Sequence, residues 1–98
     1  MATTDGEYGA ITDATEDTEA VCDLVKKTVE EKTGKKYVEF KAVKYRQKDV
    51  VGGTNYLIKV HVGGDDYIYL TVFEDIGEEV FLHDVQDHQT IDSPLVPF

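Results

Sequence analysis

The feature that most constrains the fold is the stretch of residues 42–62, in which two runs of alternating apolar and polar residues flank a centre rich in valine and glycine. A period of two is typical of β-strands, and two such runs joined by glycines predict a long antiparallel hairpin. Val50 and Val51 occupy its tip, where turn chemistry favours Asn, Asp or Gly. Exposed valines there favour a surface that grips a partner, and a tip folded back onto its own domain is the alternative.

The length and charge of the chain limit its class. Its 98 residues predict one domain, residues 1–98, with a core built from one sheet and one helix. Twenty acidic residues against ten basic ones give a net charge of -10. Because each phosphate contact needs a cation, this charge argues against nucleic acid or an anionic membrane surface as partner and favours a basic protein.

The first residues and the cysteine content of the chain indicate the cellular compartment in which the protein is expected. Residues 1–7 are small, polar and acidic, and we expect them to be flexible. The chain shows no signal-peptide pattern and no run of membrane-span length. Its single cysteine, Cys22, cannot form an internal disulfide, which agrees with a reducing compartment. We therefore expect a cytoplasmic protein.

The first regular element expected is a helix of about twenty residues that ends before Gly34. Asp13 followed by Glu16 resembles a capping box, and Gly34 suits the residue that ends a helix. Residues at helical spacing predict the stripe that contacts the sheet. These are Val21, Leu24, Val25, Thr28 and Val29.

Four strand-like runs follow the helix, at about residues 37–48, 54–62, 67–73 and 80–86. Residues 87–98 contain two prolines and show no period, so they are expected to be irregular. A helix followed by an antiparallel meander predicts an α+β domain with the helix laid across one face of the sheet. Because alternate turns of a meander fall at the same end, the first and third hairpin turns should lie side by side.

Residues that could support catalysis or metal binding form no recognisable pattern. The histidines match no metal-ligand spacing and are expected at the surface. They are His61, His83 and His88. Glu19 and Asp23 flank Cys22 and should raise the pKa of its thiol, which argues against a nucleophile. We expect no catalysis, no cofactor and no metal.

Several runs resemble the stefins, the disulfide-free intracellular branch of the cystatin superfamily. The similar runs are residues 30–37, 40–43, 53–63 and 72–73, among which Gly-Thr-Asn-Tyr-Leu-Ile-Lys-Val from residue 53 is the specific one. The resemblance implies a cystatin-like α+β fold, with a five-stranded antiparallel sheet wrapped around one N-terminal α-helix. Residues 8–11 are placed to form its short first strand.

The resemblance also implies a function, the reversible and tight-binding inhibition of papain-like cysteine proteases (cathepsins) by occlusion of the active-site cleft. In this family a wedge of three parts enters the cleft: a segment around an N-terminal glycine, a first loop of Gln-x-Val-x-Gly, and a second loop that often begins Leu-Pro. The corresponding residues here are Tyr8, Gly9 and Ala10, then Asp49, Val50, Val51, Gly52 and Gly53, and finally Ile76 and Gly77.

Two of these loops depart from the family pattern. Val51 and Gly53 keep the motif, but Asp49 stands where Gln is expected, and residues 76–77 replace Leu-Pro. Gln47 cannot take the place of the motif glutamine, because one extra residue lies before the loop. An ionised carboxylate can only accept hydrogen bonds and is costly to dehydrate, so we expect weakened inhibition rather than none.

Other interpretations stay open. A non-inhibitory interaction module on the same scaffold is the main alternative, and an enzyme with a metal site through the histidines is a remote third. We expect a monomer that can also form a domain-swapped dimer. Strain at Val50 and Val51 would favour exchange of the half that contains the helix and first long strand.

Overall fold

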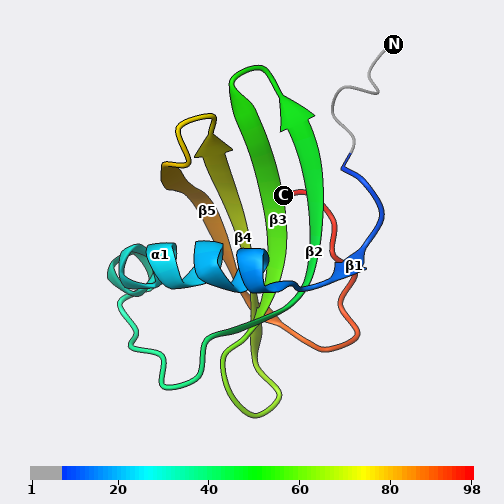
Figure 1. Ribbon diagram of the computed structural model, residues 1–98. Coiled ribbons are helices and arrows are strands. Elements are labelled where there is room, and N and C mark those ends of the chain that lie inside the picture. Colours follow the sequence, from blue (N-terminus) through cyan, green and yellow to red (C-terminus); the bar gives the residue numbers. More distant parts are fainter. Residues whose placement is uncertain (1–7) are drawn as a thin grey trace.

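The computed structural model describes residues 8–98, so the flexibility expected for residues 1–7 lies outside the described part. Five antiparallel strands form one sheet in the order β1-β2-β3-β4-β5, and one helix lies across it (Figure 1). The elements are β1 (Thr12–Asp13), α1 (Glu16–Thr33), β2 (Lys41–Val50), β3 (Gly53–His61), β4 (Tyr67–Asp75) and β5 (Val80–Gln89). This arrangement confirms the cystatin-like α+β fold.

Helix α1 begins at a different cap from the one predicted. The Thr15 hydroxyl accepts a hydrogen bond from the Thr18 amide at 3.2 Å, and the Thr15 amide donates to the Thr18 hydroxyl at 3.3 Å. The predicted box of Asp13 and Glu16 is wrong, because Asp13 belongs to strand β1. Gly34 ends the helix with a φ of 75°, as its freedom to adopt positive φ predicts.

The buried stripe of α1 is rotated relative to the prediction. Its apolar members against the sheet are Val21, Cys22, Val25 and Val29. Leu24 is 69% exposed and Thr28 is also exposed, so the prediction is wrong for these two residues. Leu24 and Thr28 lie on the side of the helix away from Cys22. The side chain of Cys22 packs in the core instead. Among residues 8–98, no helix combines the length and apolar character needed to cross a membrane.

The central strands follow the predicted alternation. Their side chains toward α1 are Tyr56, Ile58 and Val60 from β3 and Ile68, Leu70 and Val72 from β4. Strand β2 departs from it, because the register shifts between Ala42 and Lys44. This bulge places both Ala42 and Tyr45 in the core that contacts the helix, whereas simple alternation puts them on opposite faces. Val38 is fully exposed, since β2 begins only at Lys41.

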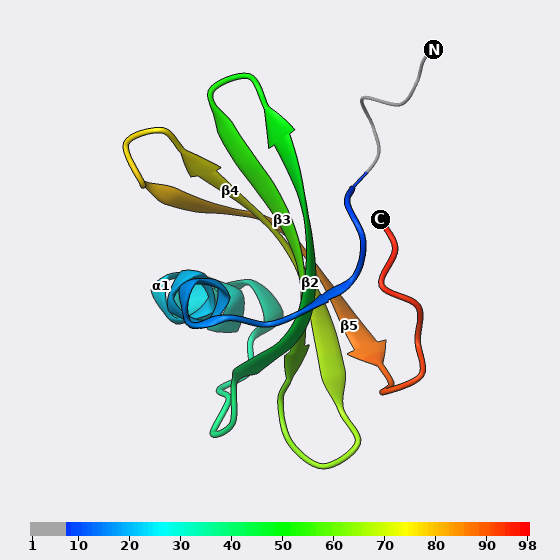
Figure 2. The same cartoon turned by 45° about the vertical axis from the view of Figure 1, so that its right-hand side comes forward.

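The C-terminal tail, residues 90–98, runs along the face of the sheet opposite α1 (Figure 2). Its Leu95 is 2% exposed and packs with Leu57 and Tyr69. The Tyr69 hydroxyl and the Lys59 ammonium both donate to the carbonyl of Ser93, at 2.8 and 3.0 Å. Residues 90–98 are irregular, as expected, but the prediction is wrong for residues 87–89, which extend strand β5 to Gln89. The contacts of Leu95 and Ser93 make the tail a packed part of the fold.

Candidate functional site

The tip of the β2–β3 hairpin is a tight turn that exposes a valine. Val50 pairs with Gly53, which leaves Val51 and Gly52 as the connection. Gly52 supplies the positive φ of 88°, and neither valine has a positive φ. The side chain of Val51 is fully exposed, so the tip is not folded back onto the domain. Val50 is half-buried at the end of β2, so the prediction of exposure is wrong for this valine. The two valines therefore lack the backbone strain that motivated the domain-swapping prediction.

Gly53 lies against the neighbouring strand. A Cβ atom built at this position would lie 2.1 Å from the Glu74 carbonyl oxygen and 2.9 Å from the Asp75 Cα. Real Cβ atoms essentially never approach other atoms this closely. Glycine at this position is therefore required for β3 and β4 to approach each other just below the tip.

The β4–β5 loop lies beside the first hairpin and is bonded to it. The Ile76 amide donates to the Gly52 carbonyl at 3.1 Å, which confirms that the first and third turns are neighbours. The Asp75 carboxylate accepts hydrogen bonds from the amides of Gly77 and Glu79, both at 2.9 Å. These bonds fix the loop while the Ile76 side chain remains 87% exposed.

The N-terminal segment runs beside β2 but does not form the strand predicted at residues 8–11. The Gly9 amide donates to the Gln47 carbonyl at 2.8 Å, and regular pairing starts only at β1. The carbonyls of Tyr8 and Gly9 instead accept hydrogen bonds from the guanidinium of Arg46, so they do not enter the strand ladder. Nothing in the sequence pattern marks Arg46, which reads as an ordinary polar residue of a strand.

Tyr8 packs onto the face of the sheet that carries the C-terminal tail. It is half-buried against the cluster of Leu57, Tyr69 and Leu95, and the Lys48 ammonium lies 5.1 Å from its ring centroid. Burial raises the pKa of the Tyr8 hydroxyl, although the charge of Arg46 opposes the shift. Gly9 and Ala10, in contrast, are exposed.

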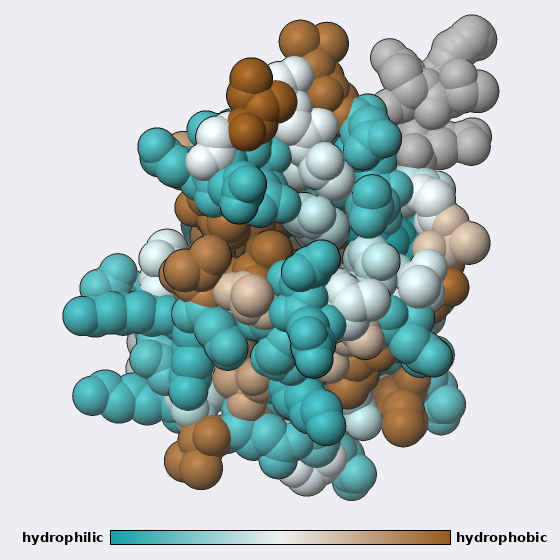
Figure 3. Space-filling view, viewed as in Figure 1, coloured by the Kyte–Doolittle hydropathy of each residue, from teal (hydrophilic) through white to brown (hydrophobic). Residues whose placement is uncertain are grey.

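Carboxylates surround the apolar apices. Asp49 is exposed at the end of β2, opposite Thr54, whose hydroxyl lies 3.4 Å from one carboxylate oxygen. The other acidic residues at this end are Glu74, Asp75, Glu78 and Glu79. Apolar surface is visible at the upper edge of the molecule, where the hairpin tips lie (Figure 3). The site therefore presents two exposed apolar tips, Val51 and Ile76, within an acidic surround.

Of the residues that could support other chemistry, Cys22 and His61 are engaged in the fold, whereas His83 and His88 are exposed. Cys22 is fully buried, and burial raises the pKa of its thiol, with a further increase from Glu19 and Asp23. Residues 8–98 contain no group of three or more His, Cys, Asp or Glu side chains that could hold a metal ion. His61 pairs with Glu39 and bonds the Gly64 carbonyl at 2.7 Å.

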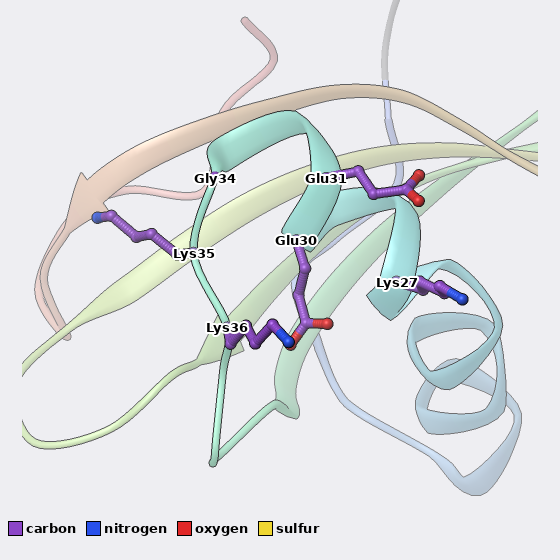
Figure 4. A pocket seen from close by; sticks show the side chains of 6 residues that line it. All are labelled: Lys27, Glu30, Glu31, Gly34, Lys35 and Lys36. Atoms are coloured by element: carbon purple, nitrogen blue, oxygen red, sulfur yellow. The ribbon is translucent and has the colours of Figure 1, made fainter.

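A surface depression of about 330 Å³ lies at the C-terminal end of α1 (Figure 4). Its lining residues are Lys27, Glu30, Glu31, Gly34, Lys35 and Lys36. The Glu30 carboxylate already bonds the Tyr37 amide at 2.8 Å, where it ties the loop after the helix to the helix end. The depression contains none of the residues of the hairpin tips or the N-terminal segment.

The fold is that of a cystatin, and comparison with known proteins agrees. The cystatin domain family matches residues 6–89, and the chain belongs to this family. A cystatin-B from Oplegnathus fasciatus is 42% identical over 96 residues, which is 95% of each chain. A stefin-C from Bos taurus is 47% identical over 74 residues, 76% of this chain and 72% of its own length.

A cystatin-B from Homo sapiens is 45% identical over 74 residues, which is 76% of this chain and 74% of its own length. These relatives identify the chain as a stefin-type cystatin. Proteins of this family are inhibitors of cysteine proteases and not enzymes. The expectation that this chain is no enzyme is thereby confirmed.

Proposed function

We propose that this chain inhibits papain-like cysteine proteases, cathepsins among them, by inserting its acidic, apolar-tipped edge into the active-site cleft. The observation that carries the proposal is the hydrogen bond from the Ile76 amide to the Gly52 carbonyl. It joins two hairpin tips into one apex, while the Val51 and Ile76 side chains remain exposed. A preformed apolar projection binds a cleft at low entropic cost.

Each part of the edge has a separate role in this proposal. Gly9 lies along the non-primed subsites, since it is exposed and has no side chain to exclude. Val51 and Gly52 enter the cleft beside the catalytic cysteine of the protease, and Ile76 contacts the far side. The inhibitor occupies the cleft and offers no bond for cleavage, so inhibition is reversible.

Asp49 lowers the affinity in this proposal. Its carboxylate is exposed in the free protein, and insertion of the tip would remove water from it. A missing hydrogen bond costs about 0.5–1.5 kcal/mol and an unpaired charge costs more. Binding should therefore be roughly ten- to a hundredfold weaker than with an amide at this position.

The matched variant Asp49→Gln tests both the proposal and its alternative. Inhibition constants for papain and a cathepsin would be measured with the native chain and with this variant. The proposal predicts measurable inhibition by the native chain and roughly ten- to a hundredfold tighter inhibition by the variant. An inactive native chain that becomes an inhibitor through the substitution would support the non-inhibitory interaction module.

The cytoplasm is the compartment that we propose for the protein. A single cysteine, buried in the core, suits a reducing environment and makes no demand for disulfide formation. The monomer is the form in which we propose that the edge acts. Exchange into a domain-swapped dimer would open the β2–β3 hairpin and so dismantle the tip.

A further inference from the structure

The side chain of Arg46 connects three segments that are distant in sequence. Its Nε donates to the Gly9 carbonyl at 2.7 Å, and its two terminal nitrogens donate to the carbonyls of Tyr8 at 3.1 Å and Leu95 at 2.9 Å. One rigid, planar guanidinium therefore bonds the N-terminal segment and the C-terminal tail at once, while its own backbone lies in β2.

We propose that Arg46 is a positioning residue for protease binding, and that the C-terminal tail contributes to inhibition through it. This inference rests on the proposed function, because it assigns a cause for the placement of Gly9 in the wedge. The side chain of Arg46 is half-buried on the sheet. It acts only through the two segments to which it is hydrogen-bonded.

The N-terminal segment depends on side chains for its position. Gly9 has a single backbone hydrogen bond to β2, and β1 provides only two paired residues beyond it. Such a short edge pairing is weak on its own. Arg46 adds two hydrogen bonds to consecutive carbonyls, and the Lys48 ammonium adds a contact with the face of the Tyr8 ring.

The tail provides the third carbonyl that Arg46 bonds, that of Leu95, and this carbonyl is held in place by packing. Leu95 is 2% exposed and packed in a cluster with Leu57 and Tyr69, so its carbonyl has a defined position. The Tyr69 hydroxyl and the Lys59 ammonium bond the carbonyls of the preceding turn, which limits movement of the tail along the sheet. The tail and the N-terminal segment lie on the same side of the sheet in both ribbon views (Figures 1 and 2).

Loss of the guanidinium should release the segment but leave the fold intact. The hydrogen bond to the Gly9 carbonyl is exposed and those to the carbonyls of Tyr8 and Leu95 are only partly buried, so water can replace the guanidinium at each of them. The released segment would then have to be ordered again when a protease binds, and this cost appears mainly as faster dissociation. We expect about a tenfold increase in the off-rate, equivalent to about 1.4 kcal/mol.

A first experiment needs no protease. Hydrogen exchange of the Gly9 amide would be measured in the native chain, in Arg46→Met, and in Lys41→Met, which removes the same charge at the far end of β2. Protection should fall by roughly tenfold in the Arg46 variant only. Deleting residues 94–98 should lower it as well, but not further in the Arg46→Met background. Equal protection in all of these forms would overturn the proposal.

A second experiment separates positioning from general destabilisation. Off-rates from papain would be compared for the native chain, Arg46→Met and Arg46→Lys, each with and without residues 1–9. In the full chain the methionine variant should dissociate about tenfold faster than the native chain. The lysine variant should show a smaller increase, because lysine keeps the positive charge but lacks the planar set of donors of the guanidinium. In the truncated chain the difference should vanish, and an undiminished difference would refute positioning.

The two experiments distinguish the two hypotheses. If no form of the chain inhibits papain, the proposed function fails, while the exchange of the Gly9 amide still decides whether Arg46 and the tail hold the segment. If inhibition is strong but the Gly9 amide exchanges equally in all forms, the proposed function stands and the role of Arg46 is refuted.

Discussion

Replacement of Gly53 by alanine should separate the two hairpins on which the proposed site depends. The added Cβ would lie 2.1 Å from the Glu74 carbonyl oxygen and 2.9 Å from both the Asp75 Cα and the Phe73 ring. The first two of these atoms are backbone atoms of β4, which cannot rotate away as a side chain does. Contacts below 3.0 Å are essentially absent from real structures, so β3 and β4 must move apart by roughly 1 Å.

The free-energy cost follows from two contributions. Overpacking of this kind costs about 1–3 kcal/mol. Separation of the strands also breaks the bond between the Ile76 amide and the Gly52 carbonyl, which contributes about 0.5–1.5 kcal/mol. The free energy of unfolding should thus fall by about 2–4 kcal/mol. For a domain of this size the midpoint of thermal unfolding should fall by roughly 10–30 °C.

Thermal denaturation followed by circular dichroism would measure this effect. Gly77→Ala is the matched control, because a Cβ atom there meets only the Asp75 carboxylate at 3.4 Å, an ordinary contact at the end of a side chain. The control should unfold within a few degrees of the native chain, on the scale of about 0.5 kcal/mol. Equal midpoints for the Gly53 and Gly77 variants would show that β4 does not exclude a side chain at residue 53.

Three further predictions concern the rest of the fold. Leu95→Ala should lower the free energy of unfolding by about 2–5 kcal/mol, since this residue is 2% exposed, and an unchanged urea midpoint would show that the tail does not pack. Thr15→Ala should cost about 1 kcal/mol through loss of the helix cap, whereas a cost near zero in the same assay would argue against the cap. Cys22 should react with iodoacetamide only as fast as the chain opens, because burial raises the pKa of its thiol; rapid labelling of the native protein at neutral pH would contradict this.

Local pattern was sufficient to predict the central elements. The side chains of β3 and β4 that were predicted for the core recur at a period of two, and those of Ile58 and Leu70 are fully buried. The end of α1 at Gly34 follows from the same kind of local rule, since glycine tolerates the positive φ of 75° found there. These features depend on residues that are close together in sequence.

The features that were mispredicted depend on tertiary context. Leu24 lies at helical spacing with the core residues. Whether Leu24 or Cys22 faces the sheet, however, depends on how the helix is rotated about its axis against the strands. The bulge after Ala42 has no local signature, and it reassigns Tyr45 to the other face. The sequence pattern predicts a strand from residue 37, but β2 begins only at Lys41, which leaves Val38 outside the strand and exposed.

The candidate site shows the same division. The exposed tips at Val51 and Ile76 could be predicted from turn positions in a meander. The place of Tyr8 could not, because its half-buried packing depends on Leu95, which lies almost at the other end of the chain. Arg46 was missed for the same reason, since its partners are carbonyl groups, and backbone carbonyls leave no trace in the residue pattern.

We propose that the two hairpin tips form the surface that enters a protease cleft. The most direct measurement is a titration of papain of known active-site concentration with the native chain and with two matched variants, Ile76→Ser and Ile91→Ser. Both isoleucines are exposed, at 87% and 70%, but Ile91 belongs to the tail on the far face of the sheet. We expect inhibition at one inhibitor per enzyme, weakened at least several-fold by the change at Ile76 and unaffected by the change at Ile91. Full papain activity at micromolar inhibitor, or equal loss of affinity in both variants, would contradict this proposal.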